Sequence, residues 1–176
     1  MSTVRKLSRT TSQRKAMLRS LTTQILLHGK IKTTDTRAKE ARKIVEPLIA
    51  LACKEADNFE SVTVKAKVAR KDKDGKRIKE EVNGKKKTVY DVVDKVIKKD
   101  KPSRLAARRK ILSVLYPAST FVDPKKKKTK KSIDLVAKLF DEYAPKYKDR
   151  KGGYTRIIKI GQRQGDQAME VLFELV

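Results

Sequence analysis

The sequence has almost none of the residues from which metal centres and disulfides are built. Its 176 residues include one cysteine, one histidine and no tryptophan. A structural zinc site needs several Cys or His ligands, so this chain cannot assemble one. An intrachain disulfide is excluded too, which agrees with a reducing compartment. Cys53 falls in an apolar run and is interpreted as a small buried hydrophobic residue.

Long apolar runs and catalytic motifs are also missing. No stretch approaches the ~20 apolar residues of a bilayer span, and no apolar core of a signal peptide follows Arg5, so we expect a cytoplasmic protein with no membrane partner. The glycines at 152–153 and 161–165 lack the Lys-Ser/Thr of a phosphate-binding loop. His28 is interpreted as a packing or capping residue. We therefore expect no enzyme activity, no cofactor and no small-molecule substrate.

Positive charge is abundant instead. Lysine and arginine number 46 against 21 acidic residues, for a net charge of +25 and a pI near 10.2. This balance is typical of a protein that binds a polyanion, with nucleic acid as the leading partner. The charge is uneven: residues 1–43 hold twelve basic residues against two acids, whereas residues 132–176 hold eight against seven.

The basic N-terminal quarter predicts a tail over 1–11, followed by an amphipathic helix over 13–28. Ser12 is the expected N-cap and Gly29 the expected left-handed residue after the helix. The 100° spacing gathers Met17, Leu18, Leu21, Ile25 and His28 into one apolar arc, with Lys15, Arg19 and Thr23 roughly opposite. The cationic face either contacts phosphates or is an ordinary solvated helix face.

A short strand over 30–33 and a second helix should follow. The helix is predicted by apolar residues three and four apart, from Ala38 to Ala52, after the capping cluster 34–36. Pro47 should kink this helix or mark a boundary, since it cannot donate to the preceding turn.

Residues 57–101 have a different character and are interpreted as an insertion. The segment contains fifteen basic and nine acidic residues, and Asp74-Gly75 and Asn83-Gly84 are turn signals. The alternation over 62–68, with partners from 76–82 and 85–90, favours a small charged β-meander. A flexible charged loop fits equally well, because such strands have little apolar area to bury.

The C-terminal part should supply two more helices and a hairpin. One helix starts at Pro102 and ends at Pro117; a Lys-rich connection over 119–131 leads to a second, capped by Ser132 and ended by Pro145. Strands over 154–160 and 169–175 should pair. Together with strand 30–33 they predict an α/β (α+β) fold, a two-layer domain of about four helices packed on a small mixed sheet.

The segments resemble the family of the bacterial large-subunit ribosomal protein numbered seventeen. The resemblance lies in the residues of segments 5–10, 13–19, 31–34, 38–40, 45–49, 136–140 and 152–157, and of the C-terminal segments 165–166 and 174–176. It implies a single ribosomal protein domain over 1–176 that binds large-subunit ribosomal RNA beside neighbouring proteins, near the rim of the peptide exit tunnel. Ser8, where the family commonly has glycine, and the segments 57–101 and 119–131 depart from the family pattern.

The expected RNA contacts are basic side chains of the tail and helices, together with the turn at 152–156. That turn either lies against RNA or places Tyr154 in the core. The alternatives are a DNA-compacting architectural protein, which would need an apolar wedge, and an enzyme acting on nucleic acid, which would need catalytic groups. The candidates are Arg5, Lys6, Arg9, Arg14, Lys15, Arg19, Lys32, Arg37, Lys39, Arg42, Arg109, Lys110, Gly152, Gly153, Tyr154 and Arg156.

Overall fold

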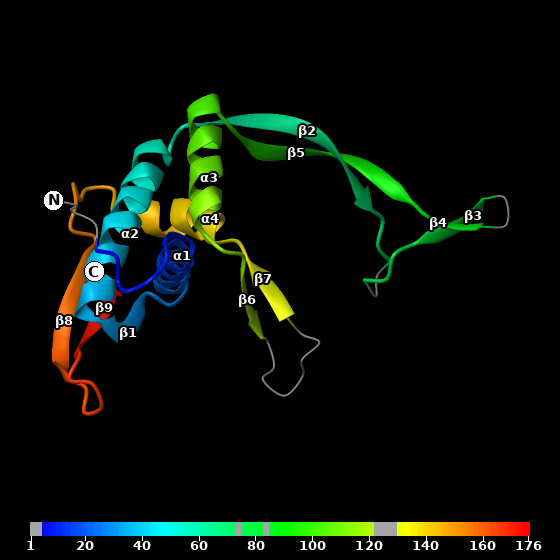
Figure 1. Ribbon diagram of the computed structural model, residues 1–176. Helices are drawn as coiled ribbons and strands as arrows, with labels where there is room; N and C mark the ends of the chain where they lie inside the picture. Colours follow the sequence, from blue (N-terminus) through cyan, green and yellow to red (C-terminus); the bar gives the residue numbers. More distant parts are fainter. Residues whose placement is uncertain (1–4, 73–74, 83–84, 122–129) are drawn as a thin grey trace. The chain divides into compact units, whose positions relative to one another are not determined.

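The chain divides into two compact units (Figure 1). The computed structural model describes residues 5–72, 75–82, 85–121 and 130–176. The first unit, called the main unit, comprises Met1–Asp57 and Pro102–Val176. The second, called the arm, comprises Asn58–Lys101. The fold is a mixture of helices and small sheets, as the sequence predicts.

Helices dominate the main unit. α1 spans Thr11–His28, α2 spans Asp35–Glu55 and α3 spans Pro102–Val114. The last helical stretch begins as α4 at Leu135–Lys138, widens into a π-helical turn at Leu139–Tyr143 and ends as α5 at Ala144–Lys146. Pro47 lies inside α2 and Pro145 inside α5, so the predictions that Pro145 ends its helix and that Pro47 marks a boundary are wrong.

The C-terminal end of α1 agrees with the sequence prediction, and its N-terminal cap does not. Gly29 follows the helix in the left-handed conformation, with φ of 78°, and its N–H donates to the Ile25 carbonyl, as predicted. At the other end α1 begins at Thr11, with Thr10 at the N-cap, so Ser12 lies within the helix. Similarly, Ser132 does not cap α4. Asp134 does, accepting hydrogen bonds from the amides of Val136 and Ala137.

The face of α1 opposite the apolar arc is not free. Thr23 on that face is 7% exposed, and its hydroxyl accepts a hydrogen bond from the Tyr116 amide at 3.0 Å. Since Tyr116 follows the end of α3, this contact ties the supposed cationic face to another part of the main unit. His28, predicted to pack or cap on the apolar side, is exposed. The simple division of α1 into one apolar and one solvated face is therefore wrong.

A three-stranded sheet completes the main unit, with strand order β1-β9-β8. β1 spans Lys30–Thr34, β8 spans Thr155–Gln162 and β9 spans Met169–Leu175. The predicted β8–β9 hairpin is confirmed, and β1 pairs with β9. Both pairings are antiparallel, so this sheet is not mixed. Val171 and Phe173 of the central strand are fully buried against the helices.

The Lys-rich connection is partly structured. β6 at Ala118–Phe121 pairs antiparallel with β7 at Lys130–Ile133. The two ends of the predicted loop over 119–131 thus form a ladder. Residues 122–129, which hold most of its lysines, lie outside the described residues.

The arm is a ribbon, with no three-stranded meander among its described residues. β2 at Phe59–Ala69 pairs with β5 at Tyr90–Asp100 along its whole length, in antiparallel register from Phe59↔Asp100 to Ala69↔Tyr90. A second short pair, β3 at Lys79–Val82 with β4 at Lys85–Thr88, lies farther along the arm. The β-branched residues between Val92 and Ile97 make β5 long enough to pair with all of β2, which the sequence interpretation overlooked.

Candidate nucleic-acid interface

The described part of the basic tail is folded as a turn. Leu7 and Ser8 have φ of 58° and 53°, and the Arg9 amide donates to the Lys6 carbonyl at 3.3 Å. Leu7 packs against the core of the main unit, while Arg5, Lys6 and Arg9 are exposed. The turn therefore presents three cations to solvent around one apolar contact.

A buried carboxylate holds this turn in place through Arg14. Glu40 of α2 is 3% exposed, and its two oxygens accept from the Lys43 ammonium at 2.9 Å and from the Arg14 guanidinium at 2.7 Å. The Lys43 hydrogen bond, and then that of Arg14, lower the pKa of Glu40 against the opposing effect of burial. The Arg14 Nε in turn donates to the Arg5 carbonyl at 2.7 Å. Glu40 thus positions the tail, a role that the sequence interpretation missed.

Arg19 and Lys15, predicted as a pair of phosphate contacts, have different surroundings. The Arg19 guanidinium donates to the Leu115 carbonyl at 2.8 Å and lies 4.2 Å from the centroid of the Tyr116 ring. It links α1 to the end of α3. Lys15 is exposed and has no ion pair within the described ranges. Of the two, only Lys15 keeps its charge available to an external partner.

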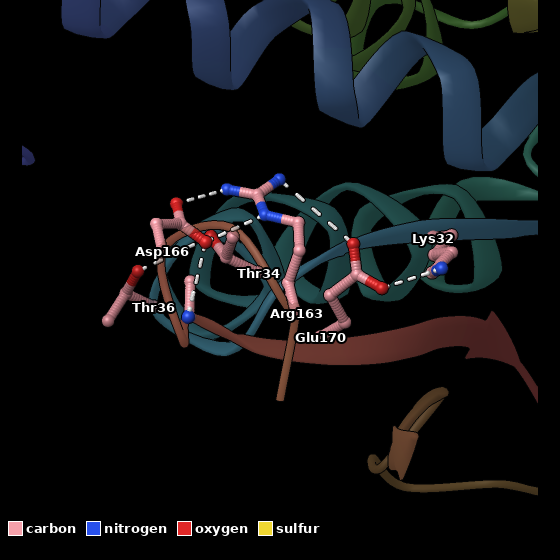
Figure 2. Close-up of polar contacts among 7 residues, drawn as sticks. Lys32, Thr34, Thr36, Arg163, Asp166 and Glu170 are labelled. Atoms are coloured by element: carbon pink, nitrogen blue, oxygen red, sulfur yellow. Dashed lines mark hydrogen bonds and ion pairs between the residues drawn. The ribbon is translucent and has the colours of Figure 1, made fainter. Parts of the chain in front are cut away.

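The cations of the sheet edge are largely neutralised by nearby carboxylates. Lys32 lies 2.6 Å from Glu170, which also faces Arg163 at 4.0 Å, and Arg163 binds Asp166 (Figure 2). The Arg163 hydrogen bond, with that from the Ala168 amide, lowers the pKa of Asp166 to about 2. In this cluster the two cations, Lys32 and Arg163, face the two carboxylates of Asp166 and Glu170. The cluster therefore has little net charge with which to attract a phosphate.

The cations of α2 are also mostly paired. Lys39 lies 2.7 Å from Asp35, and Arg42 lies 2.9 Å from Glu46, one helical turn away in each case. Arg37 is half-buried. Exposed pairs of this kind are weak, so a phosphate can compete for Lys39 and Arg42. These side chains are less available than those of the tail.

Two of the candidates belong to α3. Arg109 and Lys110 are exposed, and neither has an ion pair within the part of the chain that the structure describes. The sequence interpretation placed both away from the apolar face of this helix, and their exposure agrees with that. They form a second cationic site, separate in sequence from the tail.

The residues of the turn at Gly152-Gly153 differ sharply in solvent exposure. Both glycines are exposed, and Gly153 has φ of 62°, which a residue with a Cβ adopts only with strain. Tyr154 is 5% exposed; its ring lies 5.3 Å from that of Tyr147, and its hydroxyl donates to the Arg150 carbonyl at 3.0 Å. This burial favours the second of the two predicted roles, with Tyr154 in the core, over a direct contact with RNA. Arg156 is exposed and lies 3.7 Å from Glu174.

The turn instead borders a groove on the surface of α2. Pro47 and Ala50 contribute apolar contacts to this groove, and the backbone of Gly152 lies beside them. The groove is also lined by Lys43 and Lys151, which were not among the sequence candidates. Lys151 directly precedes the glycine pair, so its position in the sequence could have indicated it.

Other kinds of site find little support. Within the described ranges, no cluster of three or more His, Cys, Asp or Glu side chains is arranged to hold a metal ion. In the same ranges, none of the helices combines the length and apolarity needed to cross a membrane. The candidate interface therefore rests on the exposed cations of the tail, Lys15, Arg109 and Lys110.

The sequence is similar to those of known ribosomal proteins. The sequence pattern of the family described as ribosomal protein L17 matches residues 17–85 and 76–176. The large ribosomal subunit protein bL17 of Lachnospira eligens is 60% identical over 179 residues, which cover 100% of both chains. Proteins of the same name from Acetivibrio thermocellus and Ruminiclostridium cellulolyticum are 48% and 49% identical over 177 residues, with 98% of each chain covered. The chain belongs to the bL17 family of large ribosomal subunit proteins.

Proposed function

We propose that this protein is a structural constituent of the large ribosomal subunit and binds the subunit's ribosomal RNA through its main unit, beside neighbouring ribosomal proteins. The observation that carries the proposal is the anchoring of the tail. Arg14 joins the buried Glu40 to the Arg5 carbonyl, so the exposed cations beside it are held in place before RNA arrives. Less conformational entropy is then lost on binding.

The basic residues of the main unit have two different roles, since some stabilise the fold and others are available to bind RNA. Arg14 and Arg19 hold elements of the fold together, whereas Arg5, Lys6, Arg9 and Lys15 are exposed. Phosphate groups attract lysine and arginine independently of sequence and release counterions on binding. The tail and Lys15 are therefore the proposed primary contact, with Arg109 and Lys110 as a second one.

The position within the particle rests on the family resemblance alone. Members of the family are expected near the rim of the peptide exit tunnel on the solvent side of the subunit. We extend that position to this protein as part of the proposal. Crosslinking of the assembled subunit, with the attached RNA nucleotides mapped against the tunnel rim, tests it.

The proposal is tested by removing unpaired and paired cations in equal number. A triple variant Arg5→Ala, Lys6→Ala, Arg9→Ala should flatten the slope of log affinity for large-subunit RNA against log salt by about 2 to 3, at ~0.7 to 0.9 per phosphate contact. The control variant, Lys32→Ala, Lys39→Ala, Arg42→Ala, removes the same charge from side chains that already face carboxylates. Its slope should change by less than half as much.

Equal slopes for the two variants would contradict the assignment of the tail as the primary contact. Sedimentation of the tagged protein in a cell lysate tests the wider proposal. The protein should travel with large subunits. Sedimentation with the nucleoid would instead support the DNA-compacting alternative.

A further inference from the structure

The groove beside the Gly152-Gly153 turn has two different walls. Its volume is about 480 Å³, and α2 forms one wall with Pro47 and Ala50, whose side chains are exposed. The other wall is the turn itself, together with Lys151. Sites of this size hold one small ligand or one nucleotide of a longer chain.

The wall formed by the turn presents hydrogen-bond donors. The backbone amides of Gly152 and Gly153 donate no hydrogen bond within the described residues. A Cβ added at either glycine would meet no heavy atom within 4 Å beyond its chain neighbours, so the space beside both is open. Lys151 is exposed and has no ion pair in the same ranges. Two available amides beside an ammonium group suit a phosphate.

The wall formed by α2 adds a carboxylate in a fixed position. Glu46 lines the groove, and its Oε1 accepts from Arg42 Nε at 2.9 Å and from the Thr155 hydroxyl at 2.8 Å. Thr155 is 6% exposed, so the contact ties this carboxylate to the buried start of β8. Oε2 of Glu46 accepts no hydrogen bond within the part of the chain that is described. A ligand in the groove therefore meets an acceptor that is already oriented.

These opposite charges select the chemistry of the occupant. The carboxylates of an acidic peptide would be attracted by Lys151 but repelled by Glu46, and a basic peptide would meet the reverse. A nucleotide satisfies both groups, since its phosphate is an anion and its base carries N–H donors. Guanine suits a carboxylate best, because its N1–H and N2–H lie side by side on the Watson–Crick edge. That edge is accessible only in an unpaired nucleotide.

A second cationic groove of the main unit lacks this combination. It is lined by residues of α1, α2 and α3, including Arg14 and Arg19. The amides of these helical residues donate within the helices, and the two arginines already bind Glu40 and the Leu115 carbonyl. No carboxylate is among its described lining residues. The groove at the glycine turn is therefore the better nucleotide site.

We propose that the groove at the glycine turn holds one unpaired guanosine of the bound RNA. Its phosphate lies against the glycine amides and Lys151, its ribose and base ring pack on Pro47 and Ala50, and its Watson–Crick edge donates to Glu46. The proposal rests on the proposed function, because RNA is the partner that supplies the nucleotide. To the tail, which attracts phosphates of any sequence, it adds a site that recognises one base.

Free nucleotides test the chemistry of the groove in the full-length protein. In titrations followed by NMR, guanosine monophosphate should shift the amide resonances of Gly152 and Gly153, and should bind more tightly than uridine monophosphate or inorganic phosphate. Glu46→Gln keeps one oxygen for Arg42 and Thr155 but replaces the other with an amide donor. Its affinity for guanosine monophosphate should fall about tenfold, as expected for loss of a hydrogen bond to a charged group, while its affinity for phosphate is unchanged. Equal affinities for the three probes, or no shift, would overturn the proposal.

Two lysines separate the phosphate site from general attraction by positive charge. Lys151→Ala should weaken the binding of guanosine monophosphate and of inorganic phosphate by similar factors. The control, Lys148→Ala, removes the same charge from a side chain that lies 2.9 Å from Asp57 and is not among the lining residues of the groove. It should leave both affinities unchanged. Equal losses in the two variants would contradict the assignment of the phosphate to Lys151.

Kethoxal tests the same base edge in assembled subunits, because it modifies N1 and N2 of unpaired guanines. In large subunits that contain the parent protein, the guanine in the groove should be unreactive. Its reactivity should rise to that of a guanine in an open loop with Glu46→Gln, and also with Ala50→Phe, which fills the groove from an exposed position. Ala50→Ser leaves the groove open and should keep the guanine protected.

The outcomes distinguish this proposal from the proposed function. If neither Glu46→Gln nor Ala50→Phe exposes a guanine, the proposal is wrong, although the protein still resides in large subunits. A photocrosslink from p-benzoylphenylalanine at position 50 to a neighbouring protein, with none to RNA, would overturn it as well. If Ala50→Phe does not enter large subunits, the result for Glu46→Gln decides. Absence of the parent protein from large subunits would instead contradict the proposed function.

Discussion

The main unit and the arm use similar residues in opposite ways. The buried hydrophobic side chains among the described residues all belong to the main unit, from Leu18 in α1 to Phe173 in β9. The arm is rich in valine as well, yet its large apolar side chains are at least partly exposed, up to 67% for Val96. In the main unit, distant segments share one core; in the arm, a backbone ladder joins two strands. The stability of the protein should therefore reside in the main unit.

Two tyrosines, one in each unit, test this comparison directly. Replacing them should give the largest difference in the free energy of unfolding. Tyr154→Ala removes a ring that is 5% exposed, together with its hydrogen bond to Arg150, and should lower the free energy of unfolding by about 4 kcal/mol. Tyr90→Ala in the arm, at a ring 54% exposed, should cost less than about 0.5 kcal/mol. Urea denaturation measures both. Similar losses would show that the arm shares the cooperative core.

Tyr154→Phe separates the two roles of that residue. It keeps the ring and removes only the hydroxyl, so about 1 kcal/mol should be lost while RNA affinity is unchanged. A drop in RNA affinity without loss of stability would restore Tyr154 as an RNA contact.

Glu40 provides the next largest effect, since a buried carboxylate organises two cations. Glu40→Gln should cost about 2 kcal/mol at pH 7, less than a fully buried pair because Arg14 and Lys43 reach solvent. Because the pKa of Glu40 is lowered in the fold, its contribution is present above its unfolded pKa of about 4.3 and is lost as pH falls through the folded value. Urea midpoints of the two proteins should therefore converge toward pH 3. A gap that stays constant between pH 7 and pH 3 would mean that the charge of Glu40 is unimportant.

Arg19 and Lys15 sharpen the contrast between cations that hold the fold and cations that face outward. Arg19→Ala should cost about 1.5 kcal/mol, because it removes a hydrogen bond to Leu115 and a cation–π contact with Tyr116. Lys15→Ala should leave stability within about 0.5 kcal/mol but flatten the salt dependence of RNA binding by about 1. Thermal denaturation and filter binding report the two effects. If Arg19→Ala changed only RNA binding and Lys15→Ala only stability, the roles assigned to these two residues of α1 would be wrong.

Ser8 should give the smallest effect. Its φ of 53° lies in the left-handed region, which favours glycine over residues with a Cβ. Ser8→Gly should relieve backbone strain and stabilise the protein by about 0.5 kcal/mol, after allowance for the greater freedom of glycine in the unfolded chain. Ser8→Val, with a β-branched residue in the same conformation, should destabilise it. If both variants match the parent in urea midpoint, the turn does not persist in solution.

The elements of the main unit could be predicted from sequence where the signals were local. Gly29 fixed the end of α1, Pro102 marked the start of α3, and the alternation around Val171 and Phe173 indicated β9. Pro145 misled because a proline early in a new helical turn is tolerated there. Asp134, and not Ser132, caps α4 because only the former directly precedes its first turn.

The candidate site was less accessible from sequence, because pairing depends on distant residues. Nothing near Arg19 indicates that Leu115 and Tyr116 receive its guanidinium, and Glu40 reads as an ordinary helix acid until Arg14 is seen beside it. The full β2–β5 register likewise depends on residues more than twenty positions apart. The charge content could be predicted from the sequence. Which of the cations are paired with carboxylates or carbonyls within the fold could not.

Replacement of the arm is the most direct test of the central claim, that the main unit folds and enters the large subunit by itself. Phe59 and Asp100 are directly opposed at the base of the ribbon, so a short Gly/Ser bridge can replace residues 60–99. This variant should keep its helical circular dichroism, unfold in a thermal transition close to that of the parent and still sediment with large subunits. An unfolded variant, or one absent from large subunits, would contradict the account.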